Sequence, residues 1–304
     1  MDAGMPQVRV WVDGRLVGPA EPALLPLDHG FTVGDGVFET AKVVDGVVFA
    51  ADRHHARMDR SLAGLGLSPL DRDRVQEGVD AVLGVGPMSF GRLRYTVTAG
   101  PGPLGSERGT GGTTYLVTGQ EQEPPPRTTA VAVVPWARNE RGALTGLKTT
   151  SYAENVVALA AAKRAGAAEA LLPNTAGELC EGTGSNVFVV LGEVVMTPAL
   201  TAGPLAGVTR ALTIEWLRAE GVEVVEGHLP VAVLDEADEV WITSSVRDVC
   251  AVTRIEVTGP ATTATGLELP APVVMPRSLG DGAGPVTRFA QEMFARRAAV
   301  DRNP

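Results

Sequence analysis

The chain has 304 residues, 44% of them hydrophobic and 20% charged, which is enough for one large domain or two ordinary ones and too apolar for disorder to dominate. A formal net charge of −10 without a basic stripe argues against nucleic-acid binding. The apolar runs are far shorter than a membrane span, and the N-terminus does not resemble a signal peptide. The chain has only two cysteines, Cys180 and Cys250, without the spacing of a metal site. We therefore predict a cytoplasmic protein with reduced thiols and no metal site.

The N-terminal part is predicted to combine hairpins, helices and strands. Apolar alternation around Asp13-Gly14 and around Asp45-Gly46 is typical of β-hairpins, and apolar residues at helical spacing follow. A Gly/Pro-rich loop over residues 101–112 is long enough to suggest a functional role. The expected elements are hairpins over 8–17 and 37–50, helices over 53–66 and 71–84, and strands over 91–100 and 113–119.

Three consecutive prolines within residues 120–128 indicate an extended linker. We therefore predict a small domain over 1–119 and a larger domain over 129–304 that carries the candidate lysine described below. The mixture of hairpins and helices favours an α+β fold over a doubly wound parallel sheet. The elements expected after the linker are strands over 130–136, 168–173, 178–198, 238–245 and 248–257, and helices over 151–166, 208–221 and 286–300.

Glu181 is a lone acid in a Gly-rich turn that leads directly into the apolar run Val187, Phe188, Val189 and Val190. The apolar run is expected to be buried, which places the Glu181 carboxylate near the interior. An unpaired carboxylate there would cost free energy of folding. Glu181 is therefore expected to have a cationic partner.

Lys148 precedes a predicted helix and is the only lysine or arginine between Arg141 and Lys163. The ordinary interpretation is an exposed lysine. A cation is disfavoured at a helix N-terminus, however, and the same repulsion would lower the pKa of the amine. A less protonated lysine attacks carbonyl carbons and forms Schiff bases.

Several groups suited to binding an anion accompany these two residues. Gly207, Val208 and Thr209 open a helix, where backbone N–H groups and a hydroxyl favour an anion, although an ordinary threonine-capped helix start has the same sequence. Arg57 on a predicted helix and Ser245 after a predicted buried strand are further candidates, and a solvated arginine is the alternative for Arg57. A reactive amine, a buried acid and an anion site are what pyridoxal phosphate requires for its aldehyde, ring nitrogen and phosphate. The pyridinium charge would then be the cationic partner that Glu181 requires.

At this point the chain resembles the class IV aminotransferases, the fold-type IV pyridoxal-phosphate enzymes. The resemblance extends from about Asp28 to Val252 and rests on ordered segments that would each be weak alone. These segments are GDGVFET, HHARM, LKTTSYAEN, CEGTGSNVF, TPALTAGPLAGVTR and TSSVRDV. It implies a small N-terminal α/β sandwich, a larger domain with a β-barrel-like core, and a homodimer whose pockets are bounded partly by the partner's N-terminal loops.

The resemblance also implies residue roles. Lys148 would form the Schiff base and move the proton, Glu181 would pair with the pyridine nitrogen, and Asn186 would brace the turn around Glu181. Phe38 would lie in the substrate pocket. The cofactor phosphate and ring face would be held by Arg57, Leu205, Gly207, Val208, Thr209 and Ser245.

The segment after the strand over 91–100 bears on the subfamily. The Arg-x-His carboxylate trap of D-amino acid aminotransferases is absent, since Ala99 and Pro101 stand in its place, and the branched-chain pattern is also unmatched. Residues 92–109 together with 244–249 resemble aminodeoxychorismate lyase-like proteins. Arg94, Arg247 and Arg92 are candidates for binding two substrate carboxylates, and pairing with neighbouring acids such as Asp248 is the alternative, favoured for Arg92.

Three functions follow. The first is 4-amino-4-deoxychorismate lyase, which eliminates pyruvate to give 4-aminobenzoate, a folate precursor. The second is an aminotransferase of the branched-chain, D-amino acid or R-amine type that uses the same Lys148 and Glu181. The third is a non-catalytic relative, against which the presence of both residues argues.

Overall fold

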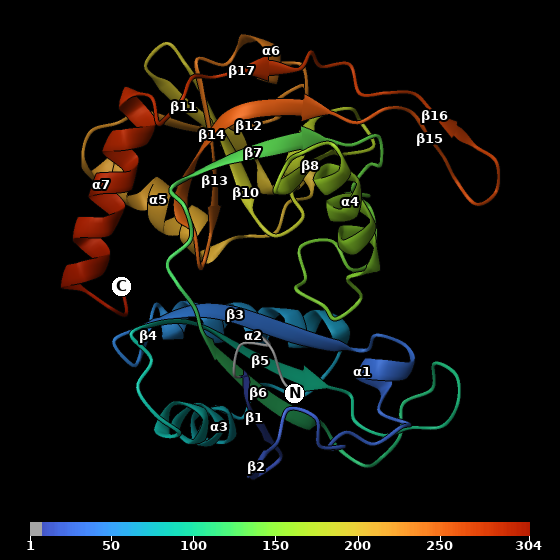
Figure 1. Cartoon of the computed structure of the whole chain (residues 1–304). Coiled ribbons are helices and arrows are strands. Elements are labelled where there is room, and N and C mark those ends of the chain that lie inside the picture. Colours follow the sequence, from blue (N-terminus) through green and yellow to red (C-terminus); the bar gives the residue numbers. More distant parts are fainter. Residues whose placement is uncertain (1–7) are drawn as a thin grey trace, which may run out of the picture. The chain divides into compact units, whose positions relative to one another are not determined.

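The computed structural model describes residues 8–304, so part of the N-terminal stretch used to argue against a signal peptide lies outside the described residues. The chain divides into two compact units (Figure 1). Among the described residues, unit 1 comprises residues 8–124, 147–151 and 301–304, and unit 2 comprises residues 125–146 and 152–300. Among residues 8–304, no helix combines the length and apolar character that crossing a bilayer requires.

Unit 1 is built on a sheet that has six strands within residues 8–304, in the order β2-β1-β6-β5-β3-β4, all paired antiparallel. The predicted hairpins are confirmed, with Asp13 and Gly14 at φ 44° and 95° and Asp45 and Gly46 at φ 52° and 75°. Its elements are β1 (Val8–Val12), β2 (Arg15–Val17), α1 (His29–Thr32), β3 (Gly36–Val44), β4 (Val47–Val48), α2 (Ala51–Leu65), α3 (Arg72–Gly84), β5 (Phe90–Thr98) and β6 (Thr114–Glu121).

Alternation along the strands divides the side chains of this sheet between two faces. One face packs against α2 and α3 and forms a core that includes Trp11, Val37, Met58 and Leu93. The next residue along β3, Phe38, belongs to the other face, because successive strand side chains point in opposite directions. The sheet therefore has a helix-covered face and a second face that carries Phe38.

Unit 2 contains a mixed sheet in the order β12-β11-β10-β13-β14-β7-β8-β9, to which β17 adds on β14, making nine strands within residues 8–304. Parallel pairs join β11 to β12, β14 to β7 and β7 to β8. The terminal strand β9 also contacts β10 and β11, so the sheet curls back on itself as a half-barrel. Its strands are β7 (Thr128–Val133), β8 (Glu169–Pro173), β9 (Leu179–Gly182), β10 (Asn186–Leu191), β11 (Val194–Pro198), β12 (Val224–Gly227), β13 (Glu239–Ser244), β14 (Asp248–Val257) and β17 (Arg277–Ser278).

Helices of unit 2 cover this sheet. α4 contacts β7 and β8, whereas α5 and α7 contact each other and strands β13 and β14 (Figure 1). A two-stranded hairpin, β15 (Ala261–Thr262) with β16 (Glu268–Leu269), extends from the unit. The helices are α4 (Ala153–Arg164), η1 (Leu200–Ala202), α5 (Val208–Ala219), α6 (Val233–Glu236) and α7 (Pro285–Val300).

The predicted mixed α+β fold is confirmed, and the division between the units falls at Pro124–Pro125, inside the predicted linker. The two units are not separated by one break in the sequence. Two later segments, Leu147–Ser151 and Asp301–Pro304, also belong to unit 1. Lys148 thus lies in the unit of the N-terminal sheet rather than in the larger one. The physical reason is backbone pairing, since Thr149 bridges to Val37 at the edge of β3.

Candidate active site

Lys148 is anchored through its backbone to two elements of unit 1. Its N–H donates to the Ser61 hydroxyl on α2 at 3.1 Å, and its carbonyl accepts from the Phe38 N–H on β3 at 3.0 Å. The helix that follows, α4, begins only at Ala153. The expectation that a helix dipole makes this amine reactive is therefore wrong, because the dipole acts only within the first turn.

The aromatic ring of Phe38 is shared by two cations. The Lys148 Nζ lies 4.4 Å from the ring centroid and the Arg94 guanidinium carbon lies 3.7 Å from it. Phe38 is 4% exposed, so these cation–π contacts occur at a buried ring. Three residues predicted separately, the Schiff-base lysine, the pocket aromatic and a carboxylate-binding arginine, are thus brought together.

Arg57 is buried rather than solvated, which excludes the ordinary interpretation. Its guanidinium donates to both oxygens of Glu39, Nε to Oε1 at 2.7 Å and Nη2 to Oε2 at 2.6 Å. The His54 Nδ1 lies 2.7 Å from Oε2 of the same carboxylate. This planar fork fixes the orientation of Arg57 on α2.

The three groups set one another's charge. Burial alone would raise the pKa of the Glu39 carboxyl, but Arg57 and His54 outweigh it and hold the pKa well below 4.5. Burial lowers the pKa of His54 below 6.5, an effect that Glu39 only partly offsets. At neutral pH the cluster therefore consists of an ionised Glu39, a charged Arg57 and a neutral His54.

In unit 2, Glu181 has the cationic neighbour that its burial requires. The Arg138 Nε lies 3.2 Å from the Glu181 Oε1, and the Leu205 N–H donates to Oε2 at 2.9 Å. The Arg138 guanidinium is oriented by two further hydrogen bonds of 3.1 Å to Oδ1 of Asn155. An ionised carboxylate in this setting is suited to pair with a protonated ring nitrogen.

The turn after Glu181 is held by side chains from α4 and its N-cap. The Thr183 carbonyl accepts from the Tyr152 hydroxyl at 3.0 Å and from the Asn155 Nδ2 at 2.5 Å. Burial and the nearby Glu181 raise the pKa of Tyr152, so it remains a donor at neutral pH. These contacts restrict the backbone that presents Glu181.

Arg247 is tied to a buried acid. Its Nη1 lies 3.0 Å from the Glu169 Oε2, and the Thr183 hydroxyl donates to the same carboxylate. Arg247 therefore forms an ion pair, as the alternative to substrate binding predicted, but its observed partner is Glu169 rather than the adjacent Asp248. Ser245 is half-buried in the same β13–β14 turn.

The start of α5 fits the phosphate of a pyridoxal cofactor. Among the described residues, no side chain caps this helix, whose N-cap is Gly207. A Cβ at Gly207 would lie 2.0 Å from the Asn186 Oδ1, so only glycine leaves the approach open. The Asn186 Nδ2 donates to the Leu205 carbonyl at 2.8 Å. Val208 and Thr209 are buried in the first turn, and their N–H groups form a site for an anion.

Several of these residues were not predicted from the sequence. Glu39 is a lone acid in the apolar strand VFETAKVV, and the reasoning applied to Glu181 would have identified it. Arg138 follows the buried strand β7 and shows no pattern of its own, and Tyr152 and Asn155 resemble ordinary residues at a helix start. Arg92 is exposed on β5, where it pairs with Lys42 rather than with the residues around Phe38.

The family model described as Amino-transferase class IV matches residues 36–255. The chain belongs to this family. Members use pyridoxal phosphate, which is therefore the cofactor of this enzyme.

Relatives within the family bear different activities in their names. The chain is 31% identical to a putative branched-chain-amino-acid aminotransferase of Methanocaldococcus jannaschii, with 82% of this chain and 88% of the relative covered. It is also 31% identical to an aminodeoxychorismate lyase of Bacillus subtilis, with 81% and 86% covered. A solved 4-amino-4-deoxychorismate lyase of Pseudomonas aeruginosa is 27% identical, with a TM-score of 0.76 and coverage of 97% and 100%. The chain is thus a pyridoxal-phosphate-dependent aminotransferase or lyase.

Proposed function

We propose that this class IV enzyme is a 4-amino-4-deoxychorismate lyase, which eliminates pyruvate from its substrate and leaves 4-aminobenzoate. The observation that carries the proposal is the Phe38 ring, which contacts both Lys148 and Arg94, the residue proposed to bind a substrate carboxylate. The similarity to lyases of Bacillus subtilis and Pseudomonas aeruginosa supports it. Ala99 and Pro101 also stand where D-amino acid aminotransferases have a carboxylate trap.

Each residue of the proposed site has a separate role in the reaction. Pyridoxal phosphate supplies an aldehyde that takes the substrate amine and a ring that withdraws electrons from the neighbouring carbon. Lys148, once its amine is released, removes the proton next to the substrate nitrogen, and Lys148 or water protonates the departing pyruvate. Glu181, kept ionised by Arg138, holds a proton on the ring nitrogen. Arg94 binds a substrate carboxylate through its planar fork, and Arg57, Val208, Thr209 and Ser245 hold the phosphate.

Arg247 is proposed as the second carboxylate-binding residue, on a condition that its contact imposes. Glu169 occupies Nη1 of Arg247, at 3.0 Å, while its side chain remains 28% exposed. A substrate carboxylate would therefore add to this ion pair at the exposed part of the guanidinium. Replacing Arg247 with Met should raise KM for the lyase substrate more than it lowers kcat.

Covalent trapping tests the lysine. Reduction of the purified enzyme with borohydride, followed by proteolysis and mass spectrometry, should place a pyridoxyl group on Lys148. A pyridoxyl group on any other lysine, or none, would contradict the assignment. This experiment does not depend on which substrate the enzyme uses.

Product analysis tests the reaction. Purified enzyme incubated with 4-amino-4-deoxychorismate should release equal amounts of 4-aminobenzoate and pyruvate. The same assay with a panel of L- and D-amino acids and a keto-acid acceptor should give little product. Transfer of the amino group without release of pyruvate would refute the lyase proposal.

An aminotransferase of the branched-chain, D-amino acid or R-amine type is the second candidate, favoured by the 31% identity to the Methanocaldococcus jannaschii relative. Lys148 and Glu181 would serve this reaction equally, with Lys148 moving the substrate proton to the cofactor. A half-reaction distinguishes the two. An amino acid added alone should bleach the cofactor band and leave pyridoxamine phosphate only if the enzyme is an aminotransferase.

We further propose a cytoplasmic homodimer. Exposed apolar side chains gather in the segment before β3 of unit 1, where Leu25 is 60% and Phe31 80% exposed and Leu24 and Leu27 are nearly half-exposed. Such a patch is typical of an interface between protein chains. Sedimentation equilibrium should give twice the chain mass, and Phe31→Asp should shift it toward one chain mass.

A further inference from the structure

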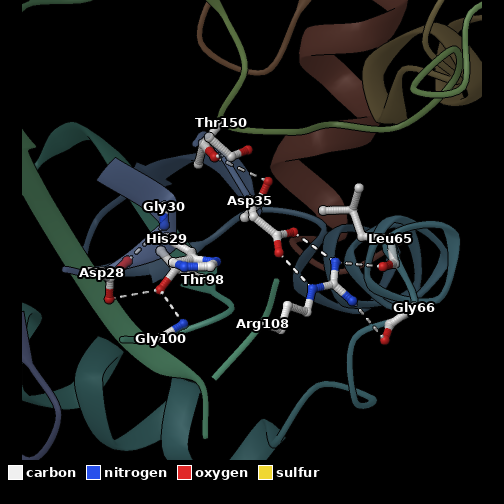
Figure 2. A network of polar contacts seen from close by, with 12 residues as sticks. Asp28, His29, Gly30, Asp35, Leu65, Gly66, Thr98, Gly100, Arg108 and Thr150 are labelled. Atoms are coloured by element: carbon white, nitrogen blue, oxygen red, sulfur yellow. Dashed lines mark hydrogen bonds and ion pairs between the residues drawn. The ribbon is translucent and has the colours of Figure 1, made fainter. Parts of the chain in front are cut away.

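The long loop between β5 and β6 carries one arginine, Arg108, whose guanidinium joins two distant parts of unit 1 (Figure 2). Its Nε donates to the Asp35 Oδ2 at 2.6 Å and its Nη2 to Oδ1 at 2.8 Å. The same guanidinium donates to the last carbonyls of α2, Leu65 at 2.7 Å and Gly66 at 3.2 Å. Arg108 thereby ties the residue that precedes β3 to the end of α2.

These two elements are the ones that hold the backbone of Lys148. β3 contributes the Phe38 N–H, and α2 contributes the Ser61 hydroxyl. The Thr150 N–H also donates to the Gly36 carbonyl at 2.8 Å, directly after Asp35. The distance between β3 and α2 therefore determines whether all three hydrogen bonds form together.

Packing at the end of α2 makes this spacing narrow. A Cβ at Gly64 would lie 2.5 Å from a methyl carbon of Leu147, the residue before Lys148. Helix α2 thus touches the lysine segment one residue before Leu65, whose carbonyl Arg108 binds. A shift of the helix end would displace the backbone at Lys148, because close-packed groups transmit strain.

The base of the loop is anchored independently of Arg108 (Figure 2). The Thr98 hydroxyl donates to the Asp28 Oδ2 at 3.0 Å and accepts from the Gly100 N–H at 3.1 Å. The Asp28 Oδ1 accepts from the Gly30 N–H, and the His29 Nε2 lies 3.0 Å from the Pro103 carbonyl. Loss of Arg108 would therefore free the centre of the loop while its ends stay attached.

We propose that Arg108 is a positioning residue for Lys148, which couples the β5–β6 loop to the lysine by clamping Asp35 and the end of α2. The inference rests on the proposed role of Lys148 for its catalytic consequence. The coupling itself concerns only contacts within unit 1. A loop displaced from its clamped position would loosen the lysine segment, and a clamped loop would hold the amine in place.

Amide hydrogen exchange on the full-length holoenzyme tests the coupling. In Arg108→Ala, the amides of Phe38, Lys148 and Thr150 should exchange about tenfold faster, as expected for loss of a charged hydrogen-bonded contact. The matched control is Arg15→Ala, which removes another ion pair of unit 1, Arg15 to Glu21 at 2.6 Å. The control should leave these three amides unchanged.

A second readout reports on the amine itself. The pH midpoint of the bound cofactor's absorbance should shift in Arg108→Ala and in Asp35→Asn, with no further shift in the double variant, because the two residues act through one contact. Arg108→Lys keeps the charge but loses the fork, and it should give an intermediate shift. It also serves as the test if Arg108→Ala does not fold.

The inference is overturned if the three amides exchange in Arg108→Ala, or in Arg108→Lys where the former does not fold, at the rate found in Arg15→Ala. Where borohydride mapping places the pyridoxyl group on Lys148, the inference is equally overturned if the absorbance midpoint does not move. Failure of the proposed function is distinguished by borohydride mapping. Absence of a pyridoxyl group on Lys148 would refute the catalytic role while the exchange result still decides the coupling.

Discussion

At the scale of single residues, Glu181, the acid proposed to bind the cofactor ring nitrogen, has contacts that favour a negative charge before any substrate binds. Arg138 and the Leu205 N–H both favour its ionised form. Asn155 holds the arginine by accepting from both terminal nitrogens, so the guanidinium cannot turn away. An acid that stays ionised at the ring nitrogen makes the cofactor a stronger electron acceptor.

Replacing Arg138 with Met removes this charge while keeping much of the side-chain volume. We expect kcat to fall about 10- to 100-fold, the equivalent of one hydrogen bond to a charged group. The pH midpoint of the cofactor absorbance should move with it, because the protonation of the ring nitrogen depends on Glu181. Steady-state kinetics and a spectroscopic pH titration measure the two effects.

Arg141 provides the control for this prediction. It lies three positions further along the chain, its side chain is 88% exposed, and its Nε is 3.7 Å from Glu140. Arg141→Met should leave both kcat and the absorbance midpoint unchanged, because an exposed pair contributes little. Equal effects of the two substitutions would mean that Arg138 does not act through Glu181.

Prediction from sequence succeeded where a residue's neighbours along the chain reveal its setting. Glu181 stands out because an apolar run follows it, and its need for a cation was argued from burial alone. The partner, Arg138, is distant in sequence and meets Glu181 only through the pairing of β7, β8 and β9. Periodicity carries no information about such contacts, so only the cofactor pyridinium was predicted as a cationic partner, and Arg138 was not.

At the scale of elements, α2 lacks a capping side chain of its own. Its N-cap, Ala50, adopts a left-handed conformation at φ 55° and makes no side-chain hydrogen bond. A distant segment supplies the cap instead. The Asn303 Oδ1 accepts from the Asp52 N–H at 3.0 Å, and the Ala50 N–H donates to the Arg302 carbonyl at 2.7 Å.

Replacing Asn303 with Ala should therefore loosen the first turn of α2. Losing an N-cap costs about 1 kcal/mol, so amide exchange at Asp52 should accelerate about fivefold. Asp71→Ala removes the local cap of α3, whose Oδ1 accepts from the Arg74 N–H at 3.1 Å, and should produce a similar effect there. If only Asp71→Ala accelerates exchange, the remote cap has no energetic role.

The two helices illustrate what sequence patterns predict about elements. The cap of α3 is local, and Asp71 begins the predicted helix 71–84. The cap of α2 comes from residues 301–304, which no rule based on adjacent residues connects to residue 52. The helix over 71–84 was predicted from apolar residues at helical spacing, and the hairpins at Asp13-Gly14 and Asp45-Gly46 from residues within the turns themselves.

At the scale of the whole molecule, stability should depend on pH through the buried cluster of unit 1. Glu39, Arg57 and His54 are each at most 4% exposed. The folded protein holds the pKa of Glu39 below 4.5 and that of His54 below 6.5, so the unfolded chain binds both protons more readily. Stability that is present above these values is therefore lost as the pH falls, first through His54 and then through Glu39.

Substitution of His54 separates the two steps. In the natural protein, the temperature of unfolding should begin to fall as the pH drops below 6.5, and it should fall further below 4.5. In His54→Gln, which has no titrating ring, the first decline should shrink while the second remains, because Glu39 still pairs with Arg57. Scanning calorimetry between pH 7.5 and about 4 measures both declines, a range that brackets the ordinary pKa values of the two groups. A curve for His54→Gln that parallels the natural protein throughout would show that His54 is not the group whose protonation destabilises the fold.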